Sequence, residues 1–152
     1  MTPRVDDRSL RDDLLAGITA APTRARAADV LVEMLKTRLP HYAWVGIYWL
    51  EGAELVLGPF LGKPSPHTRI PLNRGVCGAA ASQKTTIVVD DVNSDPRYLA
   101  CSLETKSEIV VPIMRGATVL GEIDIDSDRP AAFGAADRML LEAAAQALAE
   151  RP

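Results

Sequence analysis

The chain has 152 residues, a length that favours one folded domain over two. Hydrophobic residues make up 47% and charged residues 24%, which excludes a disordered chain and a coiled coil. The net charge is −3, from 17 basic and 20 acidic residues, so we expect neither a nucleic-acid nor a membrane partner. No apolar run approaches the roughly 18 residues of a membrane span. The charged start of the chain has no secretory signal, so we expect a cytoplasmic protein.

Apolar residues at helical spacing predict two helices near the start of the chain, after a frayed segment 1–8. Leu10, Leu14 and Ile18 fall on one face of the first helix. Thr23 is placed to cap the second helix, which Pro40 ends. Both helices therefore have an apolar face to cover a sheet.

From residue 42 the apolar period becomes two, which predicts strands. We expect strands over 42–49, 55–58, 69–72, 87–89, 108–114 and 118–127, with helices over 75–82 and 135–150. Pro112 indicates a sheet edge or a bulge. The polar connection 90–107 is long for a compact domain, and such loops are often functional. The order of elements predicts one α+β domain over 1–152, an antiparallel sheet covered by helices.

Three carboxylates alternate with isoleucines in one predicted strand. Glu122, Asp124 and Asp126 share a face, where like charges raise one another's pKa. This face is either a solvated sheet surface or a site that binds an ammonium group or keeps one carboxyl protonated as a general acid.

The two cysteines also allow two interpretations. Cys77 lies at the predicted start of a helix, which lowers a thiol pKa, and Cys101 lies in the long loop. Alternatively, both are small buried hydrophobic residues. Zinc is a poor fit because neither cysteine forms a paired ligand spacing with His41 or His67, so we expect no metal.

Trp44 and Tyr48 share a strand face, and Gly46 between them leaves room above the backbone. They are either ordinary core residues or an aromatic wall for a small ligand.

Six segments together resemble the GAF-domain free methionine-(R)-sulfoxide reductases: WVGIY at 44–48, LGPFLGK at 57–63, RGVCG at 74–78, DDV at 90–92, SEIVVP at 107–112 and DIDS at 124–127. The resemblance runs from about residue 31 to residue 148. It implies a GAF-like fold with roughly six antiparallel strands flanked by helices. It also implies that the protein reduces free L-methionine-(R)-S-oxide through a cysteine sulfenic acid and a disulfide.

The resemblance implies site residues as well. Cys101 matches the catalytic cysteine, and Cys77 matches the family's second cysteine. We expect Cys77 to attack the oxidised Cys101 if their Cα atoms come within about 7 Å. Glu108 matches a carboxylate of the substrate site and, with Asp124 and Asp126, is a candidate proton donor. Asp124 and Asp126 match substrate-binding carboxylates, and Trp44 and Tyr48 match aromatic residues of the pocket.

Two positions depart from the family, and one of them is Ser102, which stands where the family usually has an acidic residue. His67 stands where the family usually has a third cysteine, which commonly resolves the oxidised catalytic cysteine. No cofactor is expected beyond an external thiol reductant such as thioredoxin or glutathione, and a homodimer is left open. The alternative function is a non-catalytic GAF sensory domain that binds a small amino-acid-like ligand.

Overall fold

A computed structural model describes residues 7–99 and 104–152. Over these residues the chain forms a six-stranded antiparallel sheet with strand order β3-β2-β1-β6-β5-β4. The strands are β1 (Trp44–Glu51), β2 (Glu54–Leu61), β3 (Arg69–Pro71), β4 (Ile87–Val89), β5 (Ser107–Arg115) and β6 (Thr118–Ser127). The helices are α1 (Arg8–Ala20), α2 (Arg24–Arg38), α3 (Gly75–Gln83) and α4 (Ala135–Ala149), with a short 3₁₀ turn at Val92–Ser94. The expected α+β fold is confirmed.

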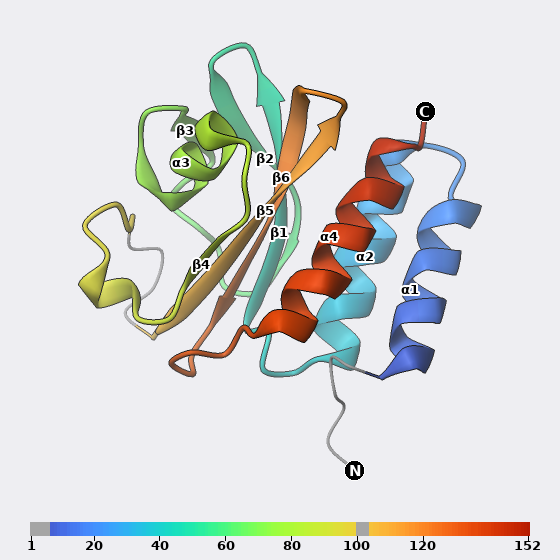
Figure 1. The fold of residues 1–152 in the computed structure, drawn as a ribbon, viewed down its shortest axis with the longest axis horizontal. Coiled ribbons are helices and arrows are strands. Elements are labelled where there is room, and N and C mark those ends of the chain that lie inside the picture. The colour runs from blue at the N-terminus through green and yellow to red at the C-terminus, as the bar shows by residue number, and fades with distance from the viewer. Residues whose placement is uncertain (1–6, 100–103) are drawn as a thin grey trace.

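The sheet has a helical layer on one side and α3 with its flanking loops on the other (Figure 1). On the first side, α1, α2 and α4 bury their apolar stripes against isoleucines and valines of β1, β5 and β6. The stripe of Leu10, Leu14 and Ile18 is buried as predicted. Each fully buried side chain of this kind stabilises the fold by about 1.5–3 kcal/mol, so this layer is the main core.

The first two helices begin at side-chain caps. Thr23 accepts a hydrogen bond from the backbone N–H of Arg26 at 3.2 Å, which confirms the predicted cap of α2. The start of α1 differs from the expectation, because Asp7 accepts from the N–H of Ser9 at 2.8 Å and the helix begins at Arg8. Residues 7 and 8 are therefore part of the helix start rather than of a frayed segment.

A buried polar contact joins the start of the sheet to the last helix. The Tyr42 hydroxyl donates to Asp137 Oδ1 at 2.6 Å. The other carboxylate oxygen of Asp137 accepts the N–H of Gly134 at 2.8 Å, at the first turn of α4. The pKa of Tyr42 is raised by burial and then by the negative charge of Asp137. This contact fixes where β1 begins relative to α4.

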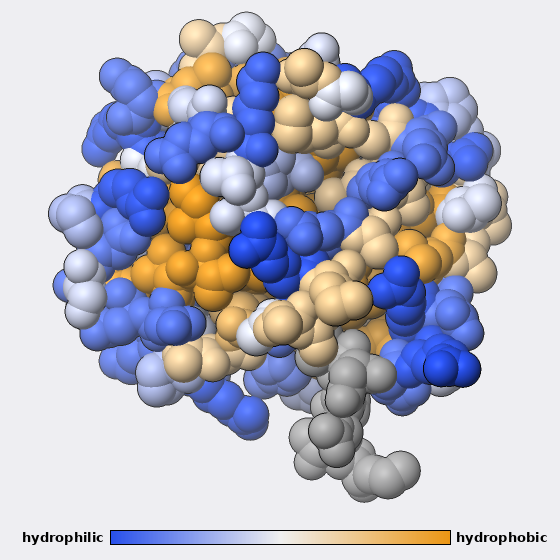
Figure 2. All heavy atoms as spheres, viewed as in Figure 1, coloured by the Kyte–Doolittle hydropathy of each residue, from blue (hydrophilic) through white to orange (hydrophobic). Residues whose placement is uncertain are grey.

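Pro112 lies in β5 just beyond the point where the edge strand β4 stops pairing with it. The edge strand β4 pairs only with residues 108–110 of β5, so Pro112 has no partner on that side. The register of β5 and β6 also shifts between Ile113 and Met114, so both predicted features occur within two residues of the proline. Figure 2 shows hydrophobic surface over β4, where Val88 is 36% exposed. Such a short edge strand offers little backbone for pairing with another chain.

The position of α3 depends on close backbone packing. A Cβ atom at Gly78 would lie 2.8 Å from the carbonyl oxygen of Leu72, so only glycine allows the helix this close to the preceding turn. Gly75 begins the helix with a φ of +71°, a conformation that glycine adopts without strain. These two glycines place Cys77, which lies between them, directly over β6.

Candidate active site

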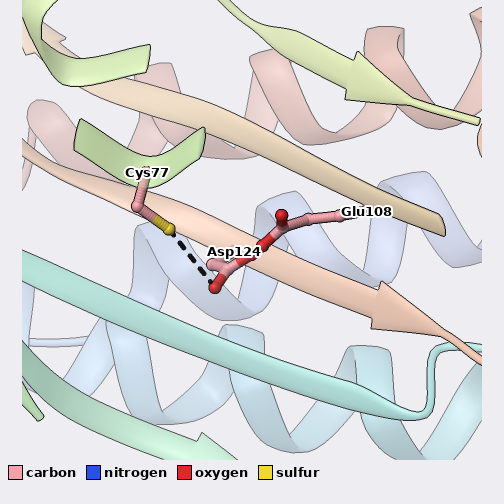
Figure 3. Close-up of side chains that lie close together, drawn as sticks. All are labelled: Cys77, Glu108 and Asp124. Carbon is pink, nitrogen blue, oxygen red and sulfur yellow. Dashed lines mark hydrogen bonds between the residues drawn. The ribbon is translucent and has the colours of Figure 1, made fainter. Parts of the chain in front are cut away.

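Carboxylates from two neighbouring strands meet one cysteine under α3. Cys77 Sγ donates to Asp124 Oδ2 at 3.5 Å, and one ligand-type atom from each of Cys77, Glu108 and Asp124 lies within 4.8 Å of the others. Figure 3 shows Cys77 pointing from α3 toward Asp124 on β6, with Glu108 reaching in from β5. Asp126 of β6 lies directly opposite Glu108 of β5 in the register of the two strands. Four of the predicted site residues therefore lie in one place.

These carboxylates are not on a solvated face. Glu122 is 0% exposed, and Asp124 and Asp126 are each 3% exposed, because α3 and its loops cover this side of β6. Both oxygens of Glu122, together with Oδ1 of Asp124 and Oδ1 of Asp126, have no hydrogen-bond partner among the described residues. The solvated-surface interpretation is wrong, and buried carboxylates without partners indicate a functional site.

Burial and mutual repulsion shift the protonation of the group. Burial raises the pKa of Glu122 and of Asp126 well above their usual ranges, and the negative charge of Asp124 adds to both shifts. Burial also raises the pKa of Asp124, while hydrogen bonding to Glu108 and Cys77 opposes that shift. Like charges this close cannot all ionise together, so the group retains protons at pH values where exposed carboxyls have lost theirs. It can serve as a proton donor.

Cys77 is held as a neutral thiol. Its side chain is buried, and its thiol pKa is raised first by burial and then by the negative charges of Asp124, Glu122 and Glu108. The carboxylates outweigh the helix start that was expected to lower this pKa. A neutral buried thiol attacks slowly, so the geometry does not favour Cys77 as a fast resolving residue.

The two aromatic residues hold the loop between β2 and β3. Trp44 Nε1 donates to the carbonyl oxygen of Lys63 at 2.9 Å, and the Tyr48 hydroxyl donates to that of His67 at 2.8 Å. Both side chains are buried, at 8% and 1% exposure. The room expected above Gly46 does not exist, because a Cβ atom there would overlap the Trp44 ring. The aromatic residues thus belong to the core and also line the site.

Two small cavities flank the carboxylates. One of about 20 Å³ is lined by Cys77, Glu108 and Asp124 together with Tyr48, His67, Leu99, one residue of β3 and the first two residues of α3. The other, of about 80 Å³, is lined by Trp44 and Asp126 and bordered by the Lys63–Glu104 ion pair, whose atoms are 2.6 Å apart. Sequence reasoning missed this ion pair, because nothing in the spacing of residues 63 and 104 signals their contact.

Cys101 lies outside the described residues, so its distance to Cys77 and to the carboxylates stays a prediction. The described residues that flank this segment do reach the site. Leu99 lines the smaller cavity and Glu104 lines the larger one. The loop that carries Cys101 therefore starts and ends beside the buried carboxylates.

This fold and site define a known class of protein. A family model for the GAF domain matches residues 23–151, and the chain belongs to that family. It is 43% identical over 102 residues to GAF domain-containing protein A of Dictyostelium discoideum, a match that covers 66% of this chain and 64% of that protein. It is 41% identical over 122 residues to the free methionine-R-sulfoxide reductase of Saccharomyces cerevisiae, covering 78% of this chain and 67% of the yeast protein.

A solved structure supports the same relationship. The free methionine-R-sulfoxide reductase of Neisseria meningitidis, solved in complex with its substrate, superposes with a TM-score of 0.89 at 34% identity. The superposition covers 95% of this chain and 86% of that chain. Among the described residues, no helix is long and apolar enough to cross a membrane.

Proposed function

We propose that this protein reduces the R-sulfoxide of free methionine to methionine, with Cys101 as the nucleophile. The observation that carries the proposal is the buried group of Glu108, Asp124 and Asp126 beside Trp44, at the base of the loop that bears Cys101. Relatives that share this fold at 34% and 41% identity carry the name of this activity.

The carboxylates have two tasks in this reaction. Unpartnered oxygens of Asp124 and Asp126 are available to accept hydrogen bonds from the ammonium group of a free amino acid. A carboxyl that retains its proton, on Glu108, Asp124 or Asp126, donates it to the sulfoxide oxygen. A methionine within a protein chain has no free ammonium group, which would restrict the site to the free amino acid.

The chemical step transfers one oxygen atom. The Cys101 thiolate attacks the sulfoxide sulfur, the sulfur–oxygen bond of the substrate breaks, and the oxygen with one proton from the carboxyl ends on Cys101 as a sulfenic acid. Methionine leaves with its sulfur reduced. A second thiol then attacks the sulfenic acid, which forms a disulfide and releases water, and an external dithiol or two small thiols restore the enzyme.

This chain departs from the family in the step that forms the disulfide, because that step needs a second thiol near Cys101. Cys77 is buried and its thiol pKa is raised, and His67 stands where the family has its resolving cysteine. Turnover is therefore expected to depend more on small thiols such as glutathione than on thioredoxin. A His67→Cys substitution should raise the thioredoxin-linked rate, with a disulfide between the introduced thiol and Cys101 detectable by mass spectrometry. A wild type that runs well on thioredoxin through a Cys77–Cys101 disulfide would contradict this expectation.

The decisive experiment is turnover of free methionine-(R)-sulfoxide with glutathione and, separately, with thioredoxin. Cys101→Ser should abolish reduction, because a hydroxyl is a much weaker nucleophile than a thiolate. Asp124→Asn should raise KM, whereas Asp90→Asn, at an exposed position outside the site, should change neither KM nor kcat. Binding of the sulfoxide without any product would instead favour a sensory GAF domain. A reducing compartment such as the cytoplasm fits the proposed thiol chemistry.

A further inference from the structure

We propose that Cys77, Glu108 and Asp124 form a binding site for a zinc-like divalent cation, and that this cation excludes the substrate. The binding rests on the geometry of the three residues alone, whereas the competition with substrate rests on the proposed function. Zinc was a poor fit to the sequence because its cysteines and histidines have no paired ligand spacing. The fold nevertheless brings residues 77, 108 and 124 from three different elements to one point.

The distances suit a small tetrahedral ion. With Zn–S near 2.3 Å and Zn–O near 2.1 Å, a tetrahedral sulfur–oxygen edge is about 3.6 Å long. Cys77 Sγ and Asp124 Oδ2 are 3.5 Å apart. An ion can thus take the place of the thiol proton that now lies between them, and that proton is released to solvent as the sulfur–metal bond forms. A Glu108 oxygen lies within 4.8 Å of the Cys77 sulfur and of an Asp124 carboxylate oxygen, and it becomes the third ligand after a small side-chain shift.

The surroundings favour a cation as well. The adjoining cavity of about 20 Å³ has room for a single ion or water molecule and is lined by the same three residues. Asp124 is 3% exposed, and its Oδ1 has no hydrogen-bond partner among the described residues. The mutual repulsion of buried anions becomes attraction when a divalent ion lies between them. Water from the cavity supplies the fourth ligand.

The ligand set selects the type of ion. A thiolate with two carboxylates suits zinc and its spectroscopic substitute cobalt, whereas magnesium prefers oxygen ligands in an octahedral arrangement. Once bound, the ion would occupy Glu108 and Asp124, the residues proposed for proton donation and substrate binding. Zinc would therefore act as a reversible inhibitor that competes with methionine sulfoxide.

The test uses the Cys101→Ser protein, which removes the other thiol and binds substrate without turnover. Titration with cobalt(II) should produce a near-ultraviolet charge-transfer band typical of thiolate-to-cobalt bonds, and zinc, but not magnesium, should abolish it. Cys77→Ser on the same background should remove the band. If that variant does not fold, Asp124→Asn should weaken cobalt binding by at least about tenfold, while Asp90→Asn should not change it.

The outcomes separate the two proposals. The metal site is refuted if no band forms, or if the band survives Cys77→Ser. The competition is tested by adding methionine-(R)-sulfoxide, which should move the cobalt titration to higher concentrations; an unchanged titration with saturating sulfoxide refutes it. If metal-free wild type shows no turnover, the proposed reductase function fails, but a cobalt band that depends on Cys77 still establishes the metal site.

Discussion

Glu122→Gln should flatten the dependence of protein stability on pH. Glu122 is fully buried, and neither of its oxygens has a hydrogen-bond partner among the described residues. Burial raises its pKa well above the ordinary value of 4.5, and the charge of Asp124 adds to the shift. Above pH 4.5 the unfolded chain loses this proton while the folded protein keeps it. The free energy of unfolding must therefore fall as pH rises from 4.5 toward the folded-state pKa.

The size of the change in slope is set by the single proton that Glu122 retains in the folded protein and loses in the unfolded chain. Within that window a single group contributes a slope of about −1.4 kcal/mol per pH unit to the free energy of unfolding. Glutamine has nearly the same shape and does not ionise. The free energy of unfolding of the variant should equal that of the wild type near pH 4.5 and exceed it at higher pH.

Urea denaturation followed by circular dichroism, at several pH values above 4.5, measures both slopes. Glu51→Gln is the matched control, because Glu51 is exposed and its replacement should leave the slope unchanged. The reasoning about burial would be refuted if the wild type and Glu122→Gln gave parallel lines.

Three further substitutions or treatments test other parts of the structure. Tyr42→Phe removes the donor at 2.6 Å from the buried Asp137 and should lower the free energy of unfolding by about 1.5–3 kcal/mol in urea titrations; an unchanged value would mean that the contact adds no net stability. Gly46→Ala should destabilise the fold by about 1–3 kcal/mol and raise KM, because the Trp44 ring must move, and an unchanged tryptophan emission spectrum would argue against that movement. Iodoacetamide should label Cys77 slowly in the native protein and quickly in urea, as followed by peptide mapping; equal rates would contradict its burial and raised thiol pKa.

Much of the fold could be predicted from local patterns. The helical stripe of Leu10, Leu14 and Ile18 and the cap at Thr23 are signals within one or two turns of chain, and both occur in the structure. Alternation along 118–127 correctly placed Glu122, Asp124 and Asp126 on one face. These features depend on backbone periodicity, which is fixed by residues close together in sequence.

The sequence alone left open whether that face meets water, because alternation assigns a side chain to a face and not to an environment. Only the tertiary structure decided it, since α3 covers the strand through glycines that let it approach the neighbouring backbone. The contact between Cys77 and Asp124 joins residues 47 positions apart, which no local pattern encodes. The buried environment of this contact reverses the expected direction of the Cys77 pKa shift, because desolvation and nearby carboxylates outweigh the helix start.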